Sequence, residues 1–205
     1  MHLLSGSLPS FLVALSFAAG LNVYATTLTL GVLARLHWVT LPAGLEPLAN
    51  TWVMVGGAVL FCCEFFADKI PFVDLVWNLA HTFIRVPIAA LLAYRVAGGL
   101  SPTAQILAAG LGAVIAGLAH GSKTAVRTLA TASPEPLSNI ALSASEDVAA
   151  VGLTWLATQH PLMAASVASI GLVVAVIFAH WTIRALRRQW TRFRTRVSVG
   201  QTIDG

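Results

Sequence analysis

Residues 161–190 read PLMAASVASIGLVVAVIFAHWTIRALRRQW, and this stretch decides the class of fold. Residues 161–180 contain no Asp, Glu, Lys or Arg. A helix of about 20 apolar residues can cross the roughly 30 Å hydrocarbon core of a bilayer. Basic residues follow at once, from Arg184 onward, and basic residues at the end of an apolar helix are typical of the cytoplasmic side. The stretch predicts a transmembrane helix whose carboxy-terminal end faces the cytoplasm.

The composition of the whole chain agrees with a membrane protein. Of its 205 residues, 57% are hydrophobic and 10% are charged, and the mean hydropathy is +0.81. Soluble domains carry about 25% charged residues, so we exclude a soluble globular domain. The net charge of +4 does not point to nucleic acid, because half of the twelve basic residues lie between Arg184 and Arg196. Such a cluster is suited to anionic lipid.

Six apolar segments are long enough to span the membrane, and turn or helix-start signals rich in Pro and Gly separate them. No alternation typical of β-strands is sustained, so the predicted fold is an all-α membrane helix bundle. We expect one transmembrane domain at 1–190 and a basic cytoplasmic tail at 191–205. The six predicted segments are 8–36, 51–69, 72–98, 102–130, 139–159 and 161–190.

The basic residues near helix ends also predict the orientation. If the carboxy-terminal cluster is cytoplasmic, Lys69, Lys123 and Arg127 fall on the same side, as expected. An even number of spans then puts both termini in the cytoplasm. The expected location is the inner (plasma) membrane, where the protein contacts lipid, and a homo-oligomer is left open.

The two halves of the chain resemble each other. Ala19-Gly20-Leu21 recurs as Ala116-Gly117-Leu118, and the Glu-Pro-Leu-x-Asn sequence at 46–50 recurs at 135–139. A unit of three spans that occurs twice has opposite orientations in its two copies. We therefore predict an inverted repeat of residues 8–98 and 102–190. Gly20-Leu21-Asn22 and Gly117 are midway along two long segments, and paired interruptions of this kind point to a transporter's central site; a long tilted helix with a packing glycine is the alternative.

Polar residues recur at helical spacing within the apolar segments. Asp74, Asn78, His81 and Arg85 are spaced so that they share one helix face, and charged residues on such a face avoid lipid. With alternating spans, the polar faces converge on the cytoplasmic half of the bundle. The candidate substrate-binding residues are His81, Arg85, His120, Lys123, Arg127, Glu64, Asp68, Asp74, Glu146, Asp147 and Asn22.

Metal and catalytic motifs are missing from this set. His81, His120 and the carboxylates are ligand types that metals accept, but no HxxxH, HExxH or CxxC spacing occurs. The two cysteines, Cys62 and Cys63, are adjacent, so a disulfide between them would not link two segments of the chain. No G-x-S-x-G surrounds a serine. We expect neither a metal site nor a cofactor.

The same polar residues carry a family resemblance. The sequence EFFADKIPFVD at 64–74, the sequence HTFIR at 81–85, and His120, Lys123 and Arg127 in HGSKTAVR resemble a bacterial family of small integral membrane proteins catalogued as a domain of unknown function. The motifs SPEPLSN at 133–139 and SED at 145–147 resemble it too. The likeness covers about residues 20–161 and implies the same architecture. It also implies an acid at position 78, where this chain has Asn.

These residues lead us to expect transport of a small solute or ion through a polar cavity open to the cytoplasm. His81, Arg85, Lys123 and Arg127 would attract an anionic group, and the carboxylates would pair with them or carry protons. Two other classes stay open: a non-transporting scaffold with structural ion pairs, and a membrane-embedded enzyme acting on lipid headgroups. The residues do not distinguish a channel from a carrier.

Overall fold

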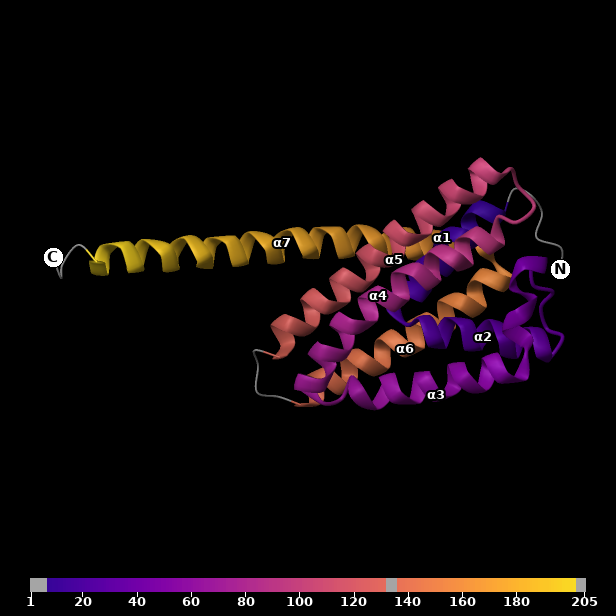
Figure 1. The fold of residues 1–205 in the computed structure, drawn as a ribbon, viewed down its shortest axis with the longest axis horizontal. Helices are drawn as coiled ribbons and strands as arrows, with labels where there is room; N and C mark the ends of the chain where they lie inside the picture. Colours follow the sequence, from indigo (N-terminus) through magenta and orange to yellow (C-terminus); the bar gives the residue numbers. More distant parts are fainter. Residues whose placement is uncertain (1–6, 132–135, 202–205) are drawn as a thin grey trace.

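The computed structural model describes the backbone of residues 7–131 and 136–201, and the side chains of these residues except at 71–72, 74–75, 127–139, 182–183 and 185–201. Within these ranges the regular structure is helical, so the all-α prediction is confirmed (Figure 1). The elements are α1 (Leu8–Leu21), α2 (Val23–Arg35), the 3-10 helix η1 (Ala43–Ala49), α3 (Thr51–Ala67), α4 (Pro71–Val96), α5 (Pro102–Thr131), α6 (Pro136–Gln159) and α7 (Pro161–Gln201).

Local sequence explains where these helices begin and end. Each helix from α4 to α7 starts with proline, whose missing N–H is not needed in the first turn and whose fixed φ suits a helix. The side chain of Asn50 caps α3 by accepting a hydrogen bond from the amide of Trp52. α2 ends where His37 adopts a positive φ of 58°, and the amides of His37 and Trp38 donate to the carbonyls of Ala34 and Leu33. This pairing is the Schellman arrangement of a helix terminus.

Four helical stretches are long and apolar enough to cross a membrane: Val76–Val96, Pro102–Val126, Ile140–Gln159 and Pro161–Trp181. A fifth span is formed if η1 and α3, which are bent by 70° relative to each other, count as one crossing. The described chain therefore has four or five candidate spans, and the prediction of six is not confirmed.

The predicted span at 8–36 is instead two short helices that reverse direction at Asn22 (Figure 1). α1 runs parallel to α5, because Ser16 faces Gly112 and Gly20 faces Ala116. α1 therefore starts at the end of the bundle where α4 turns into α5. α2 returns to that end, since Arg35 donates a hydrogen bond to Thr51 at the start of α3. α1 and α2 thus enter and leave the bundle at one end.

This reversal bears on two further predictions. Figure 1 shows the beginning of α1 and the far end of α7 at opposite ends of the bundle, so the placement of both termini on one side is not confirmed. The inverted repeat is not confirmed either, because the hairpin of α1 and α2 would have to match α5, which is one continuous helix through Gly117. Gly117 has no polar capping residue after it, whereas Gly20 is followed by Asn22.

α1 occupies the centre of the bundle. It contacts α4, α5, α6 and α7, and most of its residues are buried. A Cβ at Gly20 would lie 2.6 Å from the carbonyl oxygen of Ala116, and the side chain of Phe17 lies against Gly171 of α7. Irregular backbone at membrane depth is tolerated where protein surrounds it. The close packing around α1 meets that requirement.

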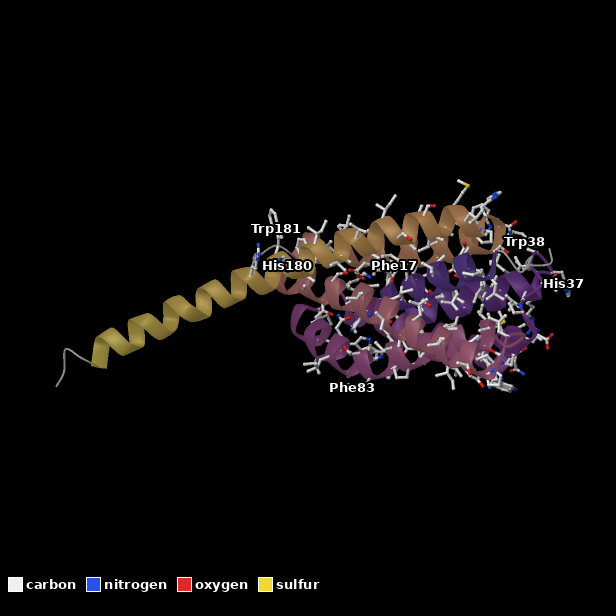
Figure 2. The ribbon with its side chains drawn as sticks, turned by 90° about the horizontal axis from the view of Figure 1, so that it is seen from above. Phe17, His37, Trp38, Phe83, His180 and Trp181 are labelled. Carbon is white, nitrogen blue, oxygen red and sulfur yellow. The ribbon has the colours of Figure 1, made fainter. Side chains whose placement is uncertain are left out.

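The distribution of side chains is the reverse of that in a soluble protein. Large apolar residues are exposed on the outer helices, for example Phe83, which Figure 2 shows on the outer face of α4, whereas Glu64, Asp68 and Arg85 expose none of their surface. Figure 2 places His37 and Trp38 at one end of the bundle and His180 and Trp181 near the point where α7 leaves it. Tryptophan is enriched at both membrane interfaces, so these pairs are consistent with the two boundaries of the hydrocarbon region.

Candidate functional site

The site is built around the reversal at Asn22. Asn22 is extended (φ −151°, ψ 105°), and its Oδ1 accepts a hydrogen bond from the amide of Ala25, which caps α2. The last carbonyls of α1 have no further helical turn to bond to. The negative end of the α1 dipole and the positive end of the α2 dipole therefore meet inside the bundle.

Arg85 of α4 binds the negative end of α1 and an acidic residue of α3. Its Nη2 forms an ion pair with Glu64 Oε1, in which neither side chain is exposed. Its Nη1 lies 3.5 Å from the carbonyl oxygen of Leu21 and 3.4 Å from Asn78 Oδ1. A buried ion pair of this kind offsets its desolvation only when further hydrogen bonds satisfy the two groups. Asn78, where the family resemblance implied an acid, supplies a neutral acceptor.

The same guanidinium fixes the tautomer of His120 on α5. Arg85 has no acceptor atoms, so Nη1 donates to His120 Nδ1 at 2.9 Å. The ring proton is therefore on Nε2, which lies 2.9 Å from Thr82 Oγ1 and 3.2 Å from the carbonyl oxygen of Asn78. His120 is thus a neutral ring that links α5 to α4 beside the ion pair.

Lys123, one turn further along α5, gathers carboxylates from two other helices. Its Nζ lies 3.3 Å from Asp68 Oδ2 and 3.6 Å from Glu64 Oε1 on α3, and 3.0 Å from Glu146 Oε2 on α6. It also donates to the carbonyl oxygen of Leu21 at 3.2 Å. Lys123 is buried, and its position at the carboxy-terminal end of α1 is favourable for a cation.

Asp147 of α6 is bound at the amino-terminal end of α2. Its Oδ1 accepts a hydrogen bond from Asn22 Nδ2 at 2.8 Å, and both residues are buried. The second oxygen of Asp147 is buried without a hydrogen-bond partner, as are Oε2 of Glu64 and the hydroxyls of Thr26 and Ser143. Acceptors that protein groups leave unsatisfied inside a membrane bundle are available to a ligand or a proton.

The comparison with family models identifies the family of the chain. The model described as Domain of unknown function (DUF4126) matches residues 10–181. The chain belongs to the DUF4126 family. No curated protein and no solved structure matches the chain. The membership confirms the resemblance drawn from the sequence motifs, and the matched range includes the complete polar site of this DUF4126 member.

The structure brings most of the predicted site residues into one cluster. Glu64, Asp68, Arg85, His120, Lys123 and Glu146 are joined by ion pairs and hydrogen bonds, and Asn22 and Asp147 form a separate hydrogen-bonded pair. His81 lies at its edge: Nδ1 donates to the carbonyl oxygen of Trp77, and the ring stacks on Trp77 and meets Tyr24 edge-on. The side chains of Asp74 and Arg127 are outside the described residues.

Two participants of the cluster were not predicted. The carbonyl of Leu21 accepts hydrogen bonds from both Arg85 and Lys123, and Thr82 binds His120. A backbone oxygen has no sequence signature of its own, although the Asn that follows Leu21 indicates a helix break. Thr82 was hidden because threonine within a transmembrane helix usually bonds its own preceding turn, as Thr82 also does with Asn78.

The geometry bears on metal binding as well. In the part of the chain that the structure describes, no three His, Cys, Asp or Glu side chains are arranged to hold a metal ion. The cluster instead joins carboxylates to two basic side chains and to the broken backbone. Its chemistry is that of charge pairing and hydrogen bonding across α2, α3, α4, α5 and α6.

Proposed function

We propose that this DUF4126 member carries a small solute or ion across the inner membrane, with the buried polar cluster as its binding site. The observation that supports the proposal most directly is the helix break at Asn22 inside a charged cluster. Discontinuous helices whose ends point at the middle of a membrane protein are the usual ion and substrate sites of secondary transporters. Placing a charged side chain at the centre of a transmembrane helix costs about 2.5–3.5 kcal/mol on the insertion scale. A functional role explains why the chain keeps several such charges.

The proposed pathway alternates access to the cluster. Its side chains are buried in the structure, so a solute enters only when the ion pairs rearrange. Lys123 is suited to such a change, because it is shared by acids of α3 and α6. Exchanging one carboxylate for another would shift α5 relative to these helices without leaving the lysine unpaired. A channel would need a continuous water path through the same residues.

We also propose a membrane orientation. The basic continuation of α7 faces the cytoplasm, which puts the turn between α3 and α4, with Lys69, on that side and the start of α1 on the other. Five spans then follow the re-entrant hairpin of α1 and α2. In this orientation only two pairs of helices keep an inverted relation. α3 runs opposite to α6, and α4 runs opposite to α7. Reporter fusions before residue 8 and after residue 201 should report opposite sides; a shared side would contradict this orientation.

A non-transporting scaffold is the second candidate. The observation in its favour is that Arg85 and Lys123 are already paired with protein acceptors, although Nε of Arg85 is buried without a hydrogen-bond partner. In a scaffold these pairs would only hold α3, α4 and α5 together. The two candidates differ in what neutralising Lys123 does to a folded protein.

Transport in proteoliposomes tests the proposal. The purified full chain is reconstituted, and uptake is measured for a panel of labelled inorganic and small organic anions and cations. We expect at least one probe to move, and we expect Lys123→Gln to abolish its movement while the protein stays folded. Arg35→Gln, at the exposed end of α2, is the matched control and should transport normally. Equal flux in wild type and Lys123→Gln would reject the cluster as the site, and no flux with any probe would favour the scaffold.

A further inference from the structure

We propose that Asp147 carries a proton within the cluster and that release of this proton drives the exchange of partners at Lys123. The inference rests on the proposed transport function and names its coupling ion. It is carried by three observations: the balance of buried charges, the neutral partner of Asp147, and the unpartnered second oxygen of its carboxyl group.

The balance of charges among the described side chains is unequal. Three carboxyl groups, those of Glu64, Asp68 and Asp147, are buried. They face two buried bases, Arg85 and Lys123. Glu146, the fourth acid of the cluster, keeps 13% of its side chain exposed and can be solvated at the edge. An uncompensated charge in such an environment is costly enough that the group takes up a proton instead. One proton makes the buried set neutral.

The pairing shows which acid holds that proton. Glu64 is bound by the guanidinium of Arg85, and Asp68 by the ammonium of Lys123. The hydrogen-bond partner of Asp147 is the neutral amide of Asn22, which donates to Oδ1. Oδ2 is buried without a hydrogen-bond partner. A carboxylic acid with its proton on Oδ2 keeps the Asn22 hydrogen bond and removes the buried charge.

Losing the proton would change the contacts of Lys123. The Oδ2–H bond breaks, the proton passes to water on the side that is open, and the electron pair stays on the carboxylate. The new negative charge then competes with Asp68 and Glu146 for the ammonium group. The groups that face Asp147 from its own and the packed helices are Glu146 of α6, Lys123 of α5, Glu64 and Asp68 of α3, and Asn22 at the start of α2.

Infrared spectroscopy of the purified full chain in lipid nanodiscs tests the inference without requiring transport. A protonated carboxyl group in a dry site gives a C=O stretching band that a carboxylate lacks, and the band shifts in D₂O. We expect this band in the wild type at neutral pH, its loss in Asp147→Asn, and its retention in Glu146→Gln, the matched change at the neighbouring acid. Retention of the band in Asp147→Asn, or its absence from the folded wild type, would overturn the inference.

A second variant keeps the inference testable if Asp147→Asn folds poorly. Asn22→Ala removes the donor to Oδ1, so we expect the wild-type band to shift in frequency without disappearing; an unchanged position would also overturn the assignment. The outcomes separate the two proposals. Flux without the band would reject the proton on Asp147 and leave transport standing. The band without flux for any probe would leave the protonated acid in place and reject transport.

Discussion

The pair formed by Arg85 and Glu64 provides the sharpest test of how the cluster is held together. Both side chains are completely buried, and they join α4 to α3. Removing one member of such a pair leaves an uncompensated buried charge and costs about 3–5 kcal/mol. We therefore expect Arg85→Met and Glu64→Met each to lower the free energy of unfolding by about that amount.

The double variant should be much less damaging than the sum of the two changes. Replacing both charges by apolar groups of similar volume is often neutral. Here a residual loss remains, because Arg85 also donates to Nδ1 of His120, and an acceptor left unsatisfied in a buried site costs about 1–3 kcal/mol. The expected double-variant loss is about 1–3 kcal/mol, so the coupling between the two positions should be about 3 kcal/mol or more.

Denaturant unfolding of the purified protein in mixed micelles measures this cycle. Arg35→Met is the control, since Arg35 lies at the exposed end of α2 and its loss should change stability by less than about 1 kcal/mol. Losses that simply add in the double variant would refute the ion pair as a coupled unit. Measurements of uptake separate a structural role from a role in transport: the double variant should recover stability but not flux, because a charge of the proposed binding site is gone. A folded double variant with wild-type uptake would remove Arg85 from the site.

Three further predictions concern the hairpin and the tail. Gly20→Ala should cost about 1–3 kcal/mol of stability, because the new Cβ would lie 2.6 Å from a backbone oxygen of α5, whereas Gly110→Ala, with open space around it, should be neutral. Asn50→Ala removes only a helix cap and should lower the free energy of unfolding by about 0.5–2 kcal/mol. Asn22→Ala should lower it by more, because Asn22 also binds a buried carboxyl group. Equal losses of stability in thermal unfolding would contradict this. Truncation after Arg188 should preserve folding and weaken binding to anionic vesicles by about 1 kcal/mol for each arginine removed, and a truncated chain that no longer folds would give the tail a core role.

The polar cluster could be predicted from the sequence because membrane physics leaves charged residues few alternatives. Arg85 lies well inside an apolar helix, so it must face protein and find an acid. The spacing from Asn78 to Arg85 fixed the face of α4, and alternating spans brought the ends of α3 and α5 to the start of α6. The spacing could not predict which acidic residue pairs with which basic residue. Glu64, Asp68 and Glu146 all lie within reach of a long basic side chain, and only the packed structure distinguishes the acid of Arg85 from those of Lys123.

The hairpin of α1 and α2 could not be predicted because residues 8–36 meet the length and hydropathy rules of a single span. Its reversal depends on the backbone torsions of one residue, and Asn22 is equally compatible with a capped break and with a polar position on a long tilted helix. The count of spans, the side of the amino terminus and the proposed repeat all rested on that one choice. The repeated Glu-Pro-Leu-x-Asn sequence plays different parts in its two copies: in the first Asn50 caps α3, whereas in the second Pro136 begins α6, so the equivalent residues do not start their helices in the same way.

The reversal also explains why the charges gather where they do. A continuous helix at 8–36 would satisfy its own carbonyls, and Leu21 would offer nothing to Arg85 or Lys123. Once the helix stops, its last carbonyls need donors and the amino-terminal end of α2 favours an acid. Two basic residues meet the first requirement, and Asp147, through the Asn22 amide, meets the second. The bases then require carboxylates of their own, which Glu64 and Asp68 supply. The cluster is therefore tied to the break, and a change that straightens α1 into α2 should release Lys123 and Asp147 together.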